Sequence, residues 1–145
     1  MTRLRDFAVR LVRWNDAEVA LRFVRHEVFV VEQRVPEDLE WDELDPQCMH
    51  ALAEDAGGAP IGCGRLLPTG YIGRIAVLAH WRGCGVGAAV LSRLIALARQ
   101  LGHREAKLNA QTSAAGFYAR YGFIPVGATF VEANIVHQTM SRPLD

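Results

Sequence analysis

The spacing of apolar and polar side chains divides the chain into short strands and helices. Residues 7–12 alternate in a way that predicts a first strand. Residues 17–33 carry apolar side chains at helical spacing, which predicts a helix. Pro36 ends this helix at the latest, since a residue before proline avoids the helical conformation. Asn15 and Asp16 offer N-caps for it.

The rest of the chain consists of short apolar runs separated by glycines and polar turns. These runs predict strands at 49–54, 61–67 and 71–78, a helix at 86–101, a strand at 107–110, a helix at 113–121, and strands at 123–126 and 135–140. The acidic stretch 37–45 reads as a loop that is solvated or that attracts a cationic amine. The order β-α-β-β-β-α-β-α-β-β predicts an α/β (α+β) sheet with helices on its faces.

Composition narrows the class of protein. The chain has 145 residues without repeats or Pro- or Ser-rich linkers, so we expect one domain over residues 1–145. Half of the residues are hydrophobic, which excludes a disordered chain. The 16 basic and 16 acidic residues balance, so we expect no nucleic-acid partner. We expect no membrane partner and a cytoplasmic protein, because apolar runs are short and the start carries Asp6 and four arginines.

Three cysteines, Cys48, Cys63 and Cys84, form no CxxC pair and have no histidine at metal-ligand spacing. An odd number also argues against a disulfide framework. We therefore expect buried or incidental thiols and no metal.

The segment with the clearest chemistry is the glycine-rich turn between the predicted strand 71–78 and the long helix. The first amides of a helix lack internal partners, and the helix dipole adds partial positive charge there. Glycines let the backbone approach a ligand, and Arg82 adds a full charge that suits phosphate oxygens. The turn therefore predicts an anion site suited to phosphates.

Several ligands suit such a turn. A P-loop requires Lys-Ser or Lys-Thr after the glycines, and neither is present. Gly83, Gly85 and Ala88 satisfy a dinucleotide string, but residues 79–82 separate it from the strand, and three strands precede that strand. A tight turn that binds nothing also stays open. The third ligand is coenzyme A.

Two ordered motifs resemble the GCN5-related N-acetyltransferase (GNAT) superfamily. Arg82-x-x-Gly85-x-Gly87 matches its (Arg/Gln)-x-x-Gly-x-(Gly/Ala) signature, and residues 117–123, FYARYGF, look like its second signature. The resemblance covers nearly the whole chain. The stretches 25–33 (RHEVFVVEQ), 42–45 (DELD), 108–111 (LNAQ) and 133–140 (ANIVHQTM) are similar to the narrower ElaA-like subgroup.

The resemblance implies a mixed, mostly antiparallel sheet in which the fourth and fifth strands splay around the pantetheine arm of acetyl-CoA. Ile75, Ala76 and Val77 would then meet the pantetheine and the thioester carbonyl through their backbone. Asn109 would bond the pantetheine, unless it is a turn or cap residue. The pyrophosphate would bind the turn, that is, Arg82, Gly83, Cys84, Gly85, Val86, Gly87 and Ala88.

The resemblance also implies direct attack of an amine on the thioester, with Tyr118 as general acid for the leaving thiolate, unless Tyr118 only packs. Many relatives place a glutamate base on the fourth strand, but residues 71–75, YIGRI, contain no carboxylate. Glu32, Glu54, His80 and His137 stay open as the base, and each has a structural reading.

The leading hypothesis is thus an acetyl-CoA-dependent N-acetyltransferase. The alternative is a non-catalytic acyl-CoA-binding regulatory module. The acceptor is a small-molecule amine or a peptide amine, and among relatives a homodimer through the late strands is common.

Overall fold

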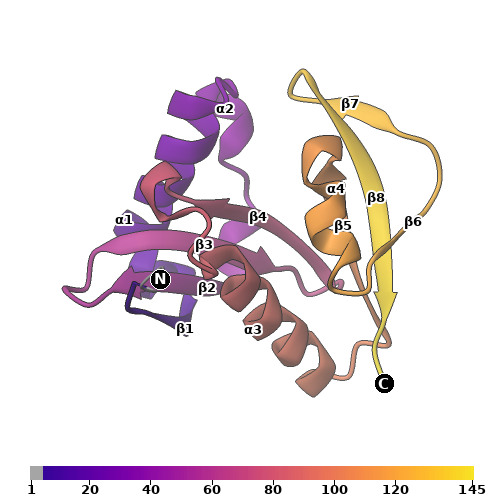
Figure 1. Ribbon diagram of the computed structural model, residues 1–145, viewed down its shortest axis with the longest axis horizontal. Coiled ribbons are helices and arrows are strands. Elements are labelled where there is room, and N and C mark those ends of the chain that lie inside the picture. The colour runs from indigo at the N-terminus through magenta and orange to yellow at the C-terminus, as the bar shows by residue number, and fades with distance from the viewer. Residues whose placement is uncertain (1–4) are drawn as a thin grey trace.

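One sheet with helices on both faces makes up the computed structural model, which describes residues 5–145 (Figure 1). Residues 1–4, which carry one of the four arginines noted at the start of the chain, lie outside this range. The sheet has the strand order β1-β2-β3-β4-β5-β8-β6, and β7 pairs with β8. All neighbours are antiparallel except β4 and β5, so the predicted mixed, mostly antiparallel fold class is confirmed. The strands are β1 (Phe7–Arg13), β2 (Met49–Asp55), β3 (Pro60–Leu66), β4 (Tyr71–Val77), β5 (Glu105–Gln111), β6 (Ile124–Pro125), β7 (Phe130–Glu132) and β8 (Ile135–Pro143).

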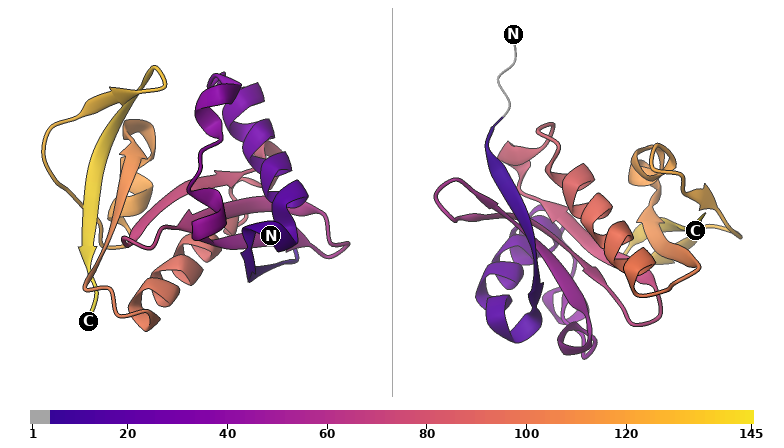
Figure 2. Two further views of the ribbon diagram at one scale, coloured as in Figure 1. Left: turned by 180° about the vertical axis from the view of Figure 1, so that it is seen from behind. Right: turned by 90° about the horizontal axis from the view of Figure 1, so that it is seen from below.

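Strand alternation builds a core on each face of the sheet. On β2, Ala51 and Ala53 point into the core that includes α3 (Val86–Gln100), whereas Leu52 points into the core that includes α1 (Trp14–Arg25). Successive side chains of a strand point to opposite faces, so one strand serves both cores. The two helices accordingly lie on opposite sides of the sheet (Figure 2).

The first helical segment differs from the single helix predicted over residues 17–33. It begins at Trp14, breaks at Ala17, where φ is −143°, and continues as α1 to Arg25. A π-helical segment, η1 (His26–Glu32), follows and replaces the predicted α-helical end. π-Helical turns are uncommon and concentrate at functional sites. The predicted caps, Asn15 and Asp16, lie inside the first turn rather than before it.

The acidic stretch is more ordered than the predicted loop. It contains a one-turn helix, α2 (Glu37–Glu40), and leads into a 3-10 turn, η2 (Asp45–Gln47). The strand β7 was also not predicted, since residues 130–132 are too few to show a pattern. The helix predicted at 113–121 appears as a 3-10 turn, η4 (Thr112–Ala114), followed by α4 (Ala115–Ala119).

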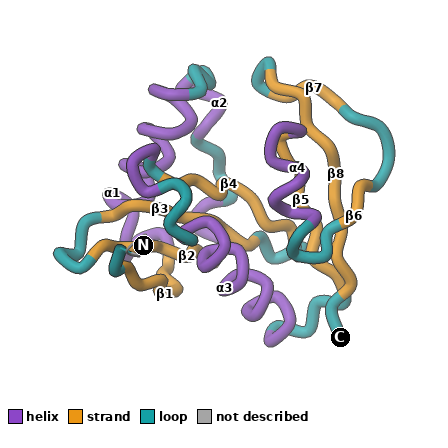
Figure 3. Tube along the Cα trace, viewed as in Figure 1, coloured by secondary structure: helices purple, strands orange, loops and turns teal. Residues whose placement is uncertain are grey.

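The parallel pair β4 and β5 separates after a very short contact. Only Tyr71 and Ile72 pair, with Lys107 and Leu108 respectively, and beyond them the two strands diverge (Figure 3). A bulge in β4 adds to this: Arg65 pairs with Gly73 and Cys63 with Ala76, so β4 carries one extra residue at Arg74–Ile75. Arg74 has φ of 51°, a left-handed conformation that non-glycine residues adopt rarely. The expected splay is therefore present.

Glycines on β3 let α3 approach the sheet. A Cβ on Gly62 would lie 2.7 Å from Val86 Cγ1, the first residue of the helix. Because Gly62 pairs with Val77, the first residue of α3 lies beside the end of β4. Within residues 5–145 the structure holds no helix with the length and apolar character needed to cross a bilayer.

Candidate active site

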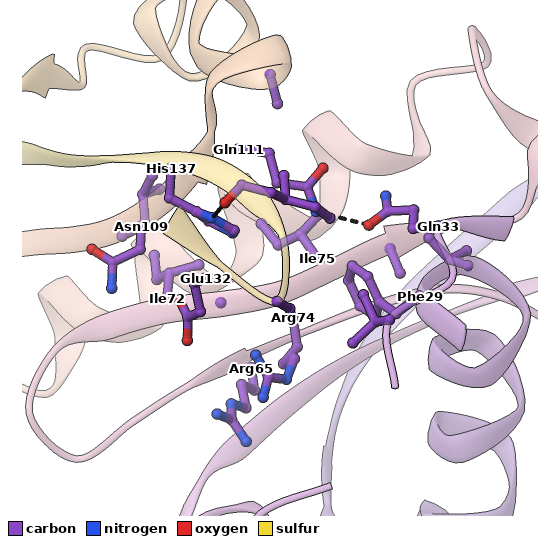
Figure 4. Close-up of a pocket in the computed structure, with 18 of the residues that line it drawn as sticks. Phe29, Gln33, Arg65, Ile72, Arg74, Ile75, Asn109, Gln111, Glu132 and His137 are labelled. Carbon is purple, nitrogen blue, oxygen red and sulfur yellow. Dashed lines mark hydrogen bonds between the residues drawn. The ribbon is translucent and has the colours of Figure 1, made fainter. Parts of the chain in front are cut away.

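The gap between β4 and β5 opens into a cleft of about 710 Å³ (Figure 4). Its walls come from β4, β5, β8, α4, η1 and the start of α3. Eight of the predicted functional residues line this cleft. They are Ile75, Ala76, Val77, Arg82, Gly87, Asn109, Tyr118 and the base candidate His137.

The glycine-rich turn reaches this cleft through Arg82 and Gly87, whereas residues 83–86 and Ala88 do not line it. Gly83 and Gly85 have φ of 79° and 88°, which explains why glycine stands at both positions. Gly85 is the N-cap of α3. No side chain in the described part of the chain caps the helix there by a hydrogen bond. Val86 is buried and offers only its backbone, whereas Cys84, Gly87 and Ala88 are half-buried. The turn thus presents amides, rather than side chains, at a positive helix end.

Arg82 uses its guanidinium within the protein. It donates to both carboxylate oxygens of Glu32, over 2.5 and 2.6 Å, and its Nε donates to the Val77 carbonyl over 3.1 Å. The hydrogen bonds from Arg82 lower the pKa of Glu32. Both side chains remain more than 40% exposed, so this ion pair is open to solvent and to competing anions.

The end of β4 presents its backbone to the cleft. Because of the bulge, Arg74 and Ile75 stand together opposite Gly64 and have no ladder partner of their own on β3. Ala76 and Val77 return to pairing, with Cys63 and Gly62. The bulge therefore turns part of this strand edge away from the ladder and toward the cleft.

Asn109 lies on the opposite wall and is oriented by β8. Thr139 Oγ1 donates to Asn109 Oδ1 over 2.8 Å. This bond occupies the amide oxygen, so the amide nitrogen is left with two hydrogens to donate. Gln111, two residues further on the same face, donates to Gln33 over 2.8 Å and so links β5 to the end of η1 (Figure 4).

Tyr118 sits in an aromatic cluster at the side of the cleft. Its ring contacts Phe117 and Phe123 edge-to-face, with centroids 5.1 and 6.1 Å apart. Burial raises the pKa of Tyr118 to about 12, because an ionised phenol would lose its hydration. The phenol therefore keeps its proton at neutral pH.

A buried ion network lies along one side of the cleft, and sequence reasoning missed it. Arg25 donates to Glu40 over 2.8 Å and to Asp45 over 2.7 Å, and all three side chains are almost fully buried. Arg65 donates to Asp45 and, through both terminal nitrogens, to Asp42, each over 2.8 Å. Part of the acidic stretch is thus neutralised inside the protein, and the prediction of a solvated loop is wrong for Glu40 and Asp45. The arginines at 65 and 74, which lie within predicted apolar strands, are the sequence feature that indicates such a network.

Arg74 joins the network from the bulge of β4. Its Nε lies 3.2 Å from Glu40 Oε2, and its Nη2 donates to the Glu40 carbonyl over 3.3 Å. Burial, with the nearby arginines Arg65 and Arg25, lowers the pKa of Arg74, although Glu40 opposes the shift. The network thereby fixes the bulge against the acidic stretch.

The four base candidates occupy different places. Glu32 is paired with Arg82, and Glu54, on β2, accepts from Arg10 over 2.7 Å. His80 and Glu54 line a separate groove of about 1010 Å³ beside α1, which contains none of residues 82–88. Of the four, His137 lines the cleft.

The cysteines do not gather with other reactive groups. Cys48 and Cys63 are buried free thiols, and burial raises the pKa of Cys63 to about 12. Cys84 lies in the turn, half-buried. In the region from residue 5 to 145 the structure forms no group of three or more His, Cys, Asp or Glu that would hold a metal ion.

Comparison with known proteins agrees with this geometry. Residues 14–144 match the family described as an acetyltransferase (GNAT) domain. The chain is 39% identical over 124 residues to the Bacillus subtilis protein YjcF, an uncharacterized N-acetyltransferase, covering 83% of this chain and 88% of YjcF. Escherichia coli ElaA is 31% identical over 91% of this chain and 97% of its own, so the ElaA-like resemblance is confirmed.

Solved structures give the same result. The crystal structure of an acyl-CoA N-acyltransferase from Pseudomonas aeruginosa has a TM-score of 0.84 and 31% identity, covering 94% of this chain and 99% of that one. The crystal structure of Escherichia coli ElaA also has a TM-score of 0.84, with 26% identity over 94% of this chain and 99% of that one. The chain therefore belongs to the GNAT family of N-acetyltransferases.

Proposed function

We propose that this acetyltransferase moves the acetyl group of acetyl-CoA directly to an amine within the β4–β5 cleft. The observation that carries the proposal is the meeting of two features at one cleft: the bulged, unpaired edge of β4 and the uncapped amides that begin α3. A cosubstrate with a diphosphate at one end and an extended amide arm suits both features, because amides bind phosphate and a strand edge binds another backbone.

In this proposal the turn from Arg82 to Ala88 binds the pyrophosphate. Gly83 and Gly85 bring the backbone close, and the helix dipole favours the negative charge. Ile75, Ala76 and Val77 bond the pantetheine arm, and the Asn109 amide nitrogen donates to it from the opposite wall. Acetyl-CoA supplies an activated acyl group as a thioester.

Two groups of the protein then act on the reaction. A backbone N–H at the Ile75 bulge donates to the thioester oxygen as it gains negative charge, an effect worth about 3–4 kcal/mol in comparable sites. Tyr118 donates its proton to the departing thiolate, and with its pKa raised by burial to about 12 the phenol is protonated at neutral pH.

The acceptor in this proposal is a small-molecule amine or a peptide amine, and the reaction takes place in the cytoplasm without nucleic acid, membrane or metal. Exposed apolar side chains on and directly after the late strands, Ile124, Val126, Val131 and Val136, fit a homodimer face.

A non-catalytic acyl-CoA-binding regulatory module is the second candidate. The observation that favours it is the sequence of β4, whose residues 71–75 bring no carboxylate to the cleft. A module of this kind needs the cofactor contacts but neither the proton donor nor an acceptor.

The test is release of free thiol from acetyl-CoA over a panel of amines. We expect release by the wild-type protein, a loss of about 10²–10³-fold in kcat for Tyr118→Phe, and unchanged affinity for CoA. Tyr121→Phe, a neighbouring tyrosine on the same signature, is the matched control. Tight CoA binding with no release for any amine would favour the regulatory module.

A further inference from the structure

His137 stands in the cleft wall at a place set by three strands. On β8 it pairs with Gln111 of β5 and with Phe130 of β7. Its ring stacks on Phe130, with centroids 5.7 Å apart, and is half-buried. Figure 4 shows it between Asn109 and Ile75, the residues on opposite sides of the gap.

The hydrogen bond to the ring decides which nitrogen is free. His137 Nδ1 lies 2.7 Å from the Ile135 carbonyl oxygen. A carbonyl can only accept, so Nδ1 carries the hydrogen of the neutral ring. Nε2 then has a lone pair, and no hydrogen bond within residues 5–145 involves it. The strand and the stacked ring hold an imidazole base at the cleft.

Apart from Glu132, the acidic groups that line the cleft are engaged in ion pairs. Glu40 and Asp42 accept from Arg25 and Arg65 in the buried network. From β7, Glu132 lines the cleft and is exposed, and from β4, Arg74 lines it as a cation. Tyr71 and Tyr118 add phenols, Arg82 is at the far end, and the facing residues of β5, Asn109 and Gln111, are uncharged.

From this geometry we propose that His137 Nε2 is the general base that deprotonates the acceptor amine, an inference that rests on the proposed acetyl transfer. The acceptor binds as an alkylammonium ion and gives one proton to Nε2, which passes it to solvent. The amine lone pair then forms the C–N bond while the C–S bond breaks. The thiolate takes its proton from Tyr118, and the phenolate recovers one from the new amide nitrogen, so the ammonium loses two protons in all.

Substitution can separate a base from a structural histidine. In His137→Asn the amide nitrogen still reaches the Ile135 carbonyl, but nothing replaces Nε2. We expect kcat for an alkylamine acceptor to fall about 10²–10³-fold, with unchanged affinity for CoA. For an arylamine, which is already neutral at neutral pH, we expect less than about threefold loss, because no proton needs to be removed before attack. The control is His26→Gln on η1, whose side chain is 40% exposed and outside the cleft.

The pH dependence of kcat gives a second readout. A third, the ¹⁵N NMR spectrum of the wild-type imidazole, needs no variant. In His137→Asn the rise of kcat with pH for the alkylamine should move to higher pH, because solvent must then take the proton of the bound ammonium ion. ¹⁵N NMR of the wild-type imidazole should show hydrogen on Nδ1 in the neutral ring. Hydrogen on Nε2 would overturn the inference, and so would equal losses for both classes of amine. If the wild-type protein acetylates no amine at all, the proposed function itself fails, whatever the tautomer.

Discussion

The Arg82 guanidinium and the Glu32 carboxylate face each other across the mouth of the cleft, joined by hydrogen bonds of 2.5 and 2.6 Å. This pair connects the end of η1 to the turn before α3, which lie 50 residues apart in the chain. An exposed pair of this kind stabilises a protein by about 0.2–1 kcal/mol. In the proposed function, the pyrophosphate carries more than one negative charge and would therefore displace Glu32 from Arg82.

Glu32→Gln should strengthen CoA binding. The substitution removes a carboxylate that competes for Arg82, and 1 kcal/mol corresponds to about fivefold in affinity. We expect the Kd for CoA, measured by calorimetry, to fall by up to about fivefold, with a smaller gain at high salt. Glu18→Gln, which removes a carboxylate paired with Arg22 on α1, should leave it unchanged. Weaker binding by Glu32→Gln would mean that Glu32 holds Arg82 in its binding position.

Asp45→Asn should destabilise the protein strongly. Asp45 Oδ1 accepts from both Arg25 and Arg65, and its side chain is 2% exposed. Removal of one member of a buried charge network leaves the remaining charges uncompensated, which costs about 3–5 kcal/mol. Urea unfolding should show this loss, whereas Asp38→Asn in the exposed part of the same stretch should stay within about 0.5 kcal/mol. A small loss of unfolding free energy in Asp45→Asn would contradict this prediction and would mean that the remaining charges rearrange around the substitution.

Stability should fall in acid partly through Asp42. Burial by itself raises the pKa of Asp42, but the hydrogen bonds from Arg65 outweigh it and lower this pKa from 3.8 to about 2. Between about pH 4 and pH 2 the unfolded chain therefore binds more protons at this site than the folded one, so stability declines as pH falls through this range. The difference in urea unfolding between the wild-type protein and Asp42→Asn should shrink as pH drops.

Burial shifts the pKa of Glu40 in the opposite direction, upward, although Arg74 and Arg25 oppose the shift. Its contribution to stability is thus fully present at low pH and declines as pH rises. The comparison with Asp42→Asn cancels this contribution, because Glu40 is common to both proteins. An unchanged difference over the whole pH range would contradict the assignment to Asp42.

Gly64→Ala should lower stability and disturb the bulge. A Cβ there would lie 2.9 Å from Leu94 Cδ1 and from Val90 Cγ1, and 3.0 Å from Ile75 Cγ1. Overpacking of a close helix–sheet contact costs about 1–3 kcal/mol. Thermal unfolding should report it, and Gly73→Ala, whose Cβ meets nothing within 4 Å, is the matched strand control for stability. Equal stability of the two variants would contradict close packing at Gly64.

Much of the fold followed from local patterns. The predicted strands at 49–54, 61–67 and 71–78 correspond to β2, β3 and β4, and the helix predicted at 86–101 is α3 to within one residue. Longer, strongly patterned segments carry enough local information to fix their type. The turn 82–88 was identified because glycine and arginine have distinctive chemistry at a helix start.

Other features depend on contacts between distant residues. The local sequence does not distinguish Glu40 and Asp45 from the exposed acidic residues around them. They are buried because they pair with Arg25 on α1 and Arg65 on β3. The π-helical turns of η1 and the break at Ala17 likewise interrupt a pattern that predicts a regular helix. The pairing of Arg82 with Glu32 spans two elements that the pattern places independently.

The amino-acid sequence thus determined the order of elements, the family and the place of the glycine-rich turn before α3, because these depend on side chains close together in the chain. Tertiary structure alone decided which carboxylates are buried, where β4 and β5 separate, and which histidine faces the gap. Those outcomes are set by packing and by charge compensation between segments 20 to 80 residues apart, such as Arg25 with Asp45 and Gln111 with Gln33.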